Sequence, residues 1–307
     1  IMRFFDLHCD TLYNMVKENK DIYKNNFHVD MFRSQKYSPY VGCFAVWIPD
    51  DFRGDNAYKF FNKAVQKLYA QENKYGKYFK ICKSFEDIED LKNQSGVILT
   101  VEGGAALAGN IDNVQNLHNF GVKIMTLTWN GTCEVGGGSE CSEGLSSFGK
   151  AALKEMEKVG IIADLSHASE KLFYDVSEIA SKPFIATHSN SRSICNHKRN
   201  LTDEQFNIIK SVNGLVGITF CNYFLKSNEE ATFDDIRKHI EHFLEMGGEN
   251  ILAIGSDFDG ADIPSEIKGI ESLEDIYDYF LKKSYKEELL NKIFFYNAYN
   301  FMRKNMI

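Results

Sequence analysis

Potential metal ligands stand at the ends of four hydrophobic segments that are far apart in the chain. All of them are histidines or acidic residues: His8, Asp10, Glu102, His167 and His188. Imidazole nitrogen and carboxylate oxygen suit zinc, and a carboxylate such as Glu102 can bridge two ions, as in paired-metal hydrolases. A single histidine of this kind is more often a hydrogen-bonded structural residue than a ligand. Five such residues together indicate a metal site.

The spacing of His8 and Asp10 adds a local test. Residues two apart on a strand point to the same side, so both side chains can reach one ion while Cys9, between them, points away. The other three residues can join them only if the strands are arranged with their carboxyl ends together. A closed parallel barrel has this arrangement, because all its strands end at one mouth.

Two further segments offer groups that could act on a substrate beside the metal. Asp257 follows the last hydrophobic segment, and a carboxylate there can take a proton from metal-activated water and return it to a leaving amine. Arg192 and Arg199 follow His188, and a guanidinium can hold a substrate carboxylate with two parallel hydrogen bonds. We interpret Asp259, which stands before a glycine, as a turn residue.

The elements that must position these residues alternate along the whole chain. Short apolar and β-branched runs predict eight strands, at 3–7, 42–48, 97–101, 123–128, 161–165, 184–187, 215–220 and 252–256. Amphipathic segments predict helices at 56–75, 86–94, 111–119, 148–159, 169–180, 202–212, 233–246 and 286–303. Eight strand–helix units without a linker predict one domain, residues 1–307, with the α/β fold of a single (β/α)8 TIM-type barrel.

Several of the predicted helices begin at residues that cap helix N-termini. Ser169 precedes one helix, Thr202 precedes the next, and Thr232 or Asp234 precedes a third. The longest irregular stretch, 130–144, follows the fourth strand, where a barrel mouth is expected. A loop of this length at the mouth suggests a substrate wall or a lid, with plain surface flexibility as the alternative.

Composition and charge limit the classes of partner. The 307 residues are 44% hydrophobic and 25% charged, as in a packed soluble domain. A net charge of −8 cannot neutralise phosphates, so we expect a small-molecule substrate and no nucleic acid or membrane partner. The sequence shows neither a signal-peptide pattern nor a run of 18 apolar residues, which predicts a cytoplasmic protein. Seven cysteines without a CxxC pair favour reduced thiols.

Taken together, the motifs resemble those of the renal or membrane dipeptidases, zinc metallopeptidases of the amidohydrolase superfamily. The matching pieces follow the family's order across nearly the whole chain: DLHCDT at 6–11, VEGG at 101–104, DLSHAS at 164–169, THSNSR at 187–192, HKRN at 197–200 and GSDFDG at 255–260. The combination is highly specific. The resemblance therefore implies a barrel hydrolase that cleaves dipeptides.

The resemblance also implies roles for individual residues. It implies two zinc ions per chain, the first bound by His8, Asp10 and Glu102 and the second by Glu102, His167 and His188. A hydroxide bridging the ions would then attack the peptide carbonyl. By the same resemblance, Asp257 looks like the proton-transfer residue, and Arg199 looks like the residue that binds the terminal carboxylate of the dipeptide.

Two positions depart from the family pattern. The family reads Leu-Thr-His-Asn after the fourth strand, where its histidine contacts the scissile carbonyl, but this chain has Trp129 followed by Asn130. Both residues carry an N–H donor, so both are candidates for contact with the substrate. The family's His-Pro-Arg-Asn reads with Lys198 in place of proline, which keeps Arg199.

Two other functions remain compatible with the sequence. The metal ligands alone do not choose the acyl substrate, so another amidohydrolase activity, on a cyclic amide, a lactone or an N-acyl amino acid, is one alternative. A metal-binding protein that lost catalysis with the missing histidine is the other. Arg199 favours dipeptides, because it predicts a need for a free terminal carboxylate. A homodimer is compatible with the sequence.

Overall fold

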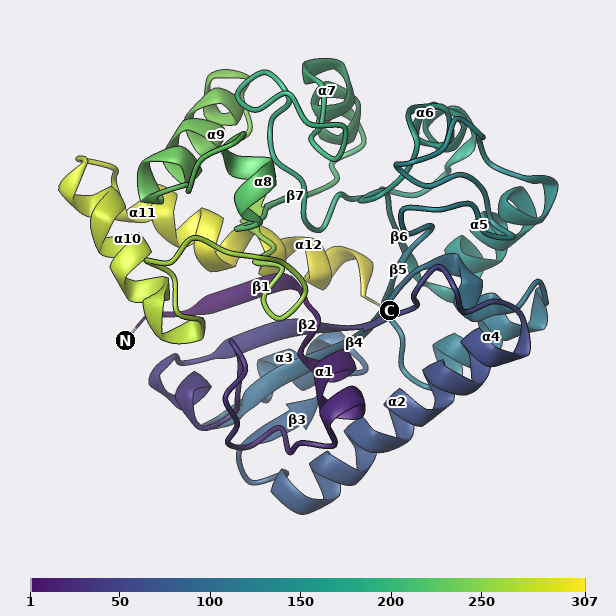
Figure 1. Ribbon diagram of the computed structural model, residues 1–307. Helices are drawn as coiled ribbons and strands as arrows, with labels where there is room; N and C mark the ends of the chain where they lie inside the picture. The colour runs from purple at the N-terminus through teal and green to yellow at the C-terminus, as the bar shows by residue number, and fades with distance from the viewer. Residues whose placement is uncertain (1, 307) are drawn as a thin grey trace.

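Parallel strands form a curled sheet at the centre of the protein, seen here in a computed structural model that describes residues 2–306 (Figure 1). The strands are β1 Phe4–Cys9, β2 Tyr40–Trp47, β3 Phe79–Ile81, β4 Ser95–Glu102, β5 Ile124–Thr126, β6 Ile162–Asp164, β7 Val216–Ile218 and β8 Leu252–Ile254. Neighbouring strands follow the order β6-β5-β4-β2-β1-β8-β7. Bridges from Ile185 to Asp164 and from Ala186 to Val216 join the two ends of this order. The predicted TIM-type barrel fold is confirmed.

The strand prediction was wrong at one predicted segment and missed one short strand. The segment predicted at 184–187 is in the ring, but it makes isolated bridges rather than a regular strand. The short strand β3 was not predicted, and it pairs only with β4, outside the ring. Three residues are too few for a period-two pattern to be recognised.

Helices follow most strands and pack around the outside of the ring. Those predicted, within a few residues, are α2 Asp55–Tyr75, α3 Phe85–Glu89, α4 Asp112–Asn119, α5 Ser147–Val159, α6 Glu170–Ile179, α7 Asp203–Ser211 and α9 Phe233–Glu245. The predicted helix 286–303 is α11 Glu287–Asn291, a π-helical turn Lys292–Tyr296 and α12 Asn297–Asn305. Those not predicted are α1 Thr11–Glu18, α8 Asn222–Leu225 and α10 Leu273–Lys282.

The predicted caps are confirmed at three helix starts. Ser169 accepts a hydrogen bond from the Leu172 N–H, and Thr202 forms a capping box with Gln205. Thr232 forms a second capping box with Asp235, so Thr232 and not Asp234 begins α9. Each cap satisfies backbone donors that the first turn of a helix leaves unpaired.

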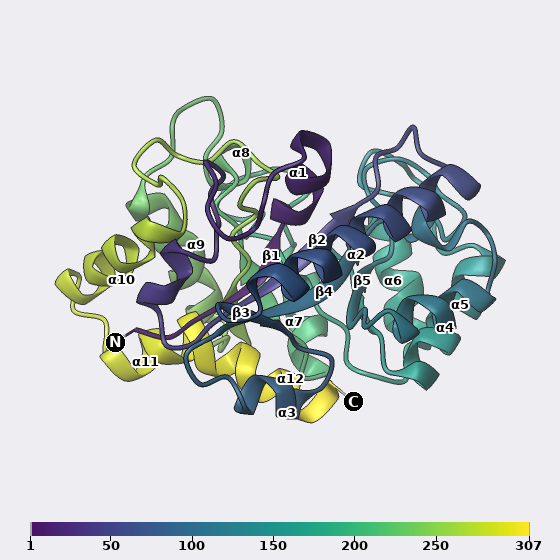
Figure 2. The same ribbon diagram turned by 90° about the horizontal axis from the view of Figure 1, so that it is seen from below.

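The barrel interior is filled by apolar side chains and closed at one end. Each segment of the ring contributes one or two residues to this interior cluster: Phe5, Leu7, Val41, Cys43, Ile98, Ile124, Ile162, Ile185, Leu215 and Ala253. Phe85 of α3 and Phe301 of α12 belong to the same cluster. Figure 2 shows α3 and α12 at one end of the strands and α1 and α8 at the other. We call the packing of α3 and α12 against the barrel interior the apolar plug. It closes one end of the barrel, and the carboxyl ends of the strands lie at the other end, which is open.

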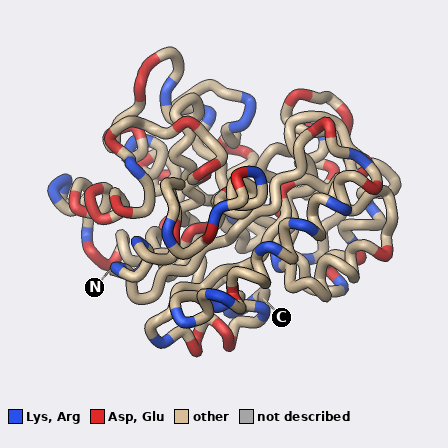
Figure 3. Tube along the Cα trace, turned by 60° about the horizontal axis from the view of Figure 1, so that its bottom comes forward, with Lys and Arg blue, Asp and Glu red and all other residues tan. Residues whose placement is uncertain are grey.

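Charged residues of both signs are distributed along the tube of the chain (Figure 3). In that view, blue and red segments are scattered over the tube. Of the helices within residues 2–306, none combines the length and the apolar character needed to cross a membrane.

Candidate metal centre

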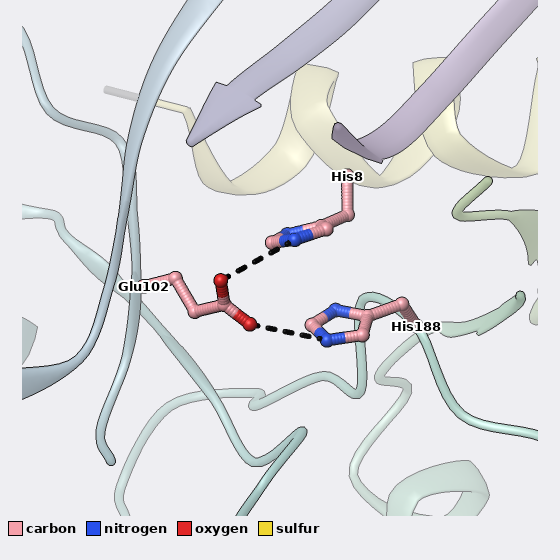
Figure 4. Close-up of side chains that lie close together, drawn as sticks. All are labelled: His8, Glu102 and His188. Carbon is pink, nitrogen blue, oxygen red and sulfur yellow. Dashed lines mark ion pairs between the residues drawn. The ribbon is translucent and has the colours of Figure 1, made fainter. Parts of the chain in front are cut away.

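Glu102 lies at the middle of the candidate metal centre, which we define as His8, Asp10, Glu102, His167, His188 and Asp257. Side chains of β4 alternate strictly, so Glu102 points inward like Ile98, while Val101 packs in the outer core. One carboxylate oxygen, Oε2, is 3.7 Å from His8 Nε2. The other, Oε1, is 3.4 Å from His188 Nε2. Figure 4 shows the carboxylate beside the two imidazoles, with one oxygen toward each ring.

A β-bulge aims His8 at this centre. Asp6 pairs with Gly42 and Cys9 with Phe44, so two residues of β1 stand opposite one residue of β2. Leu7 consequently packs in the barrel interior and Cys9 in the outer core, although they are two residues apart. After the bulge, His8 and Asp10 point to the same side, as predicted, and His8 Nε2 lies 3.2 Å from Asp10 Oδ2.

His167 and His188 both face Glu102 Oε1, and the His188 ring also stacks on the His8 ring, at 3.9 Å between centroids. His167 Nε2 lies 2.9 Å from Glu102 Oε1 and 3.0 Å from His188 Nε2. His167 has a φ of 66°, a left-handed conformation that is uncommon outside glycine and is often found at functional sites. Its Nδ1 lies 2.8 Å from Asn130 Oδ1, which can only accept, so the ring proton is on Nδ1 and Nε2 presents a lone pair.

The residues present fit a bound metal ion. His8, Glu102 and His188, and likewise His8, Asp10 and Asp257, bring one ligand atom each to within 4.8 Å of one another. Asp10 Oδ1 is buried without a hydrogen-bond partner among residues 2–306. A side chain at Gly260 would collide with Asp10 Oδ2, so the glycine keeps this carboxylate accessible. Imidazole and carboxylate ligands of this kind suit zinc.

Electrostatics also favour a cation at the centre. Burial lowers the pKa of His8, but the charges of Asp10 and Glu102 outweigh it and raise the pKa to about 10. Burial and the charge of Asp10 raise the pKa of Glu102 well above its usual value. Burial, together with Arg199, holds the pKa of His167 well below its usual value. The acidic side of the centre thus attracts positive charge, while His167 stays neutral and able to ligate.

A cavity of about 420 Å³ opens beside the centre. Glu102, His167 and Asp257 line it, so a small molecule in the cavity touches the candidate ligands directly. Asp257 has a φ of 61°, and its Oδ1 lies 3.9 Å from His8 Nε2. Burial raises the pKa of Asp257 to about 6, against the opposing charge of His8. Asp259 lies in a turn, as predicted, with a φ of 69°. Its carboxylate also accepts hydrogen bonds from the Thr11 hydroxyl and the His28 N–H.

Trp129 and Asn130 line the same cavity. Trp129 meets Trp47 edge to face at 4.9 Å between ring centroids, and Trp47 meets Tyr13 at 4.7 Å. These three rings form one wall of the cavity. Trp47 and Tyr13 were missed from the sequence, although Trp47 pairs with Glu102 across β2 and β4 and so ends its strand at the same level.

Arg199 is buried next to the centre but does not itself line the cavity. Its Nη2 donates to the His188 carbonyl oxygen, and its guanidinium lies 5.2 Å from the ring of Phe224, which does line the cavity. Its Nε is buried without a hydrogen-bond partner among the described residues. Arg192 instead pairs with Glu170 and the carbonyl of Asn200.

Two buried acids below the centre were not singled out in the sequence. Asp6 accepts hydrogen bonds from the N–H and hydroxyl of Ser256, and Asp164 accepts them from Thr126 and Thr187. Both begin an Asp-Leu pair just before a candidate ligand, and this repeated pair was the available signal.

The chain resembles known proteins in family, sequence and structure. Residues 1–306 match the family model described as "Membrane dipeptidase (Peptidase family M19)". An uncharacterized protein in the pqqA 5' region of Klebsiella pneumoniae is 29% identical, with 71% of this chain and 86% of that protein covered. Dipeptidase 3 of Macaca fascicularis is 25% identical, with 70% of this chain but 47% of that protein covered.

Solved structures agree with this relationship. A crystal structure described as dipeptidase AC, a metallopeptidase of family M19, superposes with a TM-score of 0.94 and 26% identity, covering 99% of each chain. A metallopeptidase from Rhodobacter sphaeroides, liganded with a phosphinate mimic of the dipeptide L-Ala-D-Ala, superposes with a TM-score of 0.93 at 24% identity, covering 99% of each chain. The chain therefore belongs to the membrane dipeptidase family of metallopeptidases, peptidase family M19.

Proposed function

We propose that the protein is a zinc-dependent dipeptidase with two ions per chain, which cleaves dipeptides that carry a free terminal carboxylate. The observation that carries the proposal is the position of Glu102, which faces His8 through Oε2 and both His167 and His188 through Oε1. Family membership supports the dipeptidase activity. Two sets of ligands that share one carboxylate are typical of paired-metal hydrolases.

The chain's own residues divide between the two ions. His8 and Asp10 would hold one ion with Glu102 Oε2, and His167 and His188 would hold the other with Glu102 Oε1. When bound, zinc lowers the pKa of water and polarises a carbonyl oxygen. Asn130 orients His167 through Nδ1, which keeps Nε2 directed at the centre.

Asp257 is the candidate for proton transfer. It lies beside His8 and also lines the cavity, so its carboxylate can reach both the attacking water and the departing amine of a bound dipeptide. A pKa raised to about 6 by burial places this carboxylate near neutral pH, where an acid–base group works best.

Arg199 is the candidate for recognition of the terminal carboxylate. A buried guanidinium with an unpartnered Nε has a donor available for an anion, and Phe224 connects it to the cavity wall. The dipeptide mimic bound by the Rhodobacter sphaeroides metallopeptidase is a ligand of the class we propose for this cavity.

The test is a panel of free dipeptides and their amidated counterparts, assayed with zinc-loaded protein while bound metal is counted by elemental analysis. We expect hydrolysis of free dipeptides, close to two zinc ions per chain, loss of activity with a chelator and recovery with zinc. Equal turnover of free and amidated substrates would contradict the terminal-carboxylate requirement. Metal binding without turnover would favour the non-catalytic alternative, and turnover only of cyclic amides, lactones or N-acyl amino acids would favour the other.

A further inference from the structure

A polar layer lies between the apolar barrel interior and the candidate metal centre. It consists of Thr126 on β5, Asp164 on β6 and Thr187 in the segment 184–187. Each stands two residues beyond an isoleucine of the interior cluster, namely Ile124, Ile162 and Ile185. Because strand side chains repeat with a period of two, each polar residue points inward, one level closer to the mouth.

Asp164 is the acceptor at the middle of this layer. Its side chain is fully buried, and Oδ1 accepts from the N–H groups of Ser166, at 3.0 Å, and Thr187, at 2.8 Å. Oδ2 accepts from the hydroxyls of Thr126 and Thr187, each at 2.6 Å. A carboxylate offers about four acceptor positions and no donor, so these four bonds use its full capacity.

Thr187 links Asp164 to His188 through its hydroxyl group. A hydroxyl has a single hydrogen, and that of Thr187 is donated to Asp164. The same oxygen lies 2.8 Å from His188 Nδ1, and toward this nitrogen it can only accept. The ring proton of His188 must therefore be on Nδ1, which leaves Nε2 with a lone pair facing Glu102 Oε1 at 3.4 Å.

We propose that Asp164 is a positioning residue that acts through Thr187 to select the His188 tautomer whose Nε2 can bind a metal ion. The inference rests on the proposed function, which makes His188 a ligand. Asp164 does not itself contact the metal or the substrate. It determines which nitrogen of His188 is free, in the way that outer partners of metal-binding histidines usually do.

Asp6 provides an internal contrast. It is equally buried and accepts from the N–H of His8 and from the N–H and hydroxyl of Ser256. These bonds hold backbone and hydroxyl groups, and none of them reaches an imidazole nitrogen. Asp6 therefore fixes the position of β1 against β8. Asp164 instead determines, through Thr187, which ring nitrogen of His188 carries the proton.

Replacing Asp164 tests whether it controls the His188 tautomer through Thr187. In Asp164→Asn the amide nitrogen donates and cannot accept, so the Thr187 hydroxyl loses an acceptor and is free to donate to His188 Nδ1. The ring proton then moves to Nε2, where it opposes metal binding. Thr187→Val removes the connection without changing the carboxylate, and Thr187→Ser restores a hydroxyl at the same place.

The tautomer is read directly by two-bond ¹H–¹⁵N correlation spectra of the metal-free protein, with His188 assigned from its loss in His188→Gln. We expect the Nδ1–H form in the wild type and Thr187→Ser, and a shift toward the Nε2–H form in Asp164→Asn and Thr187→Val. Zinc affinity for the second ion should fall by about 10- to 100-fold in the latter two variants only. Asp30→Asn, which alters a buried carboxylate bonded to Arg33 and Asn25, is the control and should change neither reading.

The outcomes separate this inference from the proposed function. An Nε2–H wild-type His188, or an unchanged tautomer and zinc affinity in folded Thr187→Val, overturns the role of Asp164 even if dipeptides are hydrolysed. A correct tautomer pattern in a protein that hydrolyses no dipeptide supports the role of Asp164 while the dipeptidase proposal fails. Because the threonine pair suffices, the test does not depend on whether Asp164→Asn folds.

Discussion

Three carboxylates surround His8, whereas His188 has one carboxylate, two imidazoles and a hydroxyl as neighbours. His8 Nε2 lies within 4 Å of carboxylate oxygens of Asp10, Glu102 and Asp257. His188 instead contacts His167 through Nε2 and Thr187 through Nδ1, with Glu102 as its acidic neighbour. Its ring also stacks on that of His8, at 3.9 Å between centroids, so the two rings touch. We call these the His8 half and the His188 half of the centre.

The difference shows that two equally buried imidazoles can be prepared for a metal in different ways. Burial lowers the pKa of both rings, but carboxylates reverse the effect at His8 and raise the pKa to about 10, while the pKa of His188 stays well below its usual value. The His8 half therefore attracts a cation by charge. The His188 half offers lone pairs that hydrogen bonds have oriented.

Glu102→Gln should have the largest effect, because it removes the group that the halves share. An amide has one acceptor oxygen and cannot face both halves as an acceptor. We expect metal content to fall from about two ions per chain to below one. Loss of one oxyanion donor costs an enzyme at most about 10³-fold in turnover, and we expect kcat/KM to fall by more than that. Elemental analysis and dipeptide assays measure both. Glu155→Gln on the surface of α5 is the control, and two retained ions would disprove the sharing.

His167→Ala should separate the halves. It removes an imidazole of the His188 half and leaves the His8 half untouched. We expect the variant to keep about one ion per chain, because the remaining ligands include His8, Asp10 and Glu102. Metal titration with competition by a chelator measures this, and the simultaneous loss of both ions would show that the halves do not bind independently.

Asp257→Asn asks whether the third acid of the His8 half binds metal or moves protons. As a proton-transfer group it should preserve metal content and fold but lower kcat by about 10²-fold or more. Its distance of 3.9 Å from His8 Nε2 is also compatible with a ligand, so the metal count decides. A lost ion would make Asp257 a ligand, and activity close to wild type would remove it from both roles.

Arg199→Met tests a contact outside both halves. Losing a charge-assisted hydrogen bond should raise KM for free dipeptides by about 10-fold or more and narrow their advantage over amidated substrates. Arg192→Met is the matched control, because Arg192 pairs with Glu170 away from the cavity. If the two variants behave alike, Arg199 is not the carboxylate-binding residue.

Trp129→Phe bears on the wall of the cavity beside His167. The variant keeps an aromatic ring and deletes the indole N–H. If that N–H assists the carbonyl, kcat should fall much more than KM changes, within the about 10²- to 10³-fold range of an oxyanion donor. An unchanged kcat in steady-state assays would leave Trp129 as part of the aromatic wall with Trp47.

Regular alternation explains how much of this arrangement the sequence could predict. The inward position of Glu102 follows from the unbroken pattern of β4, and the common side of His8 and Asp10 follows from their spacing. The bulge in β1 could not be predicted, because it depends on pairing with β2 rather than on the residues of β1. The left-handed φ of His167 likewise lacks a glycine to signal it.

Asp10 can be interpreted from the sequence either as a metal ligand or as the N-cap of helix α1. Asp10 stands at its N-cap but makes no capping hydrogen bond, because its carboxylate faces His8 instead. Reading Asp10 as a candidate ligand therefore concealed the start of a helix. The tautomer of His188 lies further beyond sequence analysis, because it depends on Thr187 and Asp164 meeting across neighbouring strands.

The apolar plug formed by α3 and α12 determines by which end of the barrel small molecules enter and leave the cavity. Because Phe85 and Phe301 pack with the barrel interior, closely packed side chains separate the cavity from the opposite end of the barrel. On the proposed function, a dipeptide cleaved in the cavity would yield two amino acids, and both would leave by the opening through which it came. Each product therefore competes with the next substrate for the same passage, and release of the second amino acid is a natural point for product inhibition.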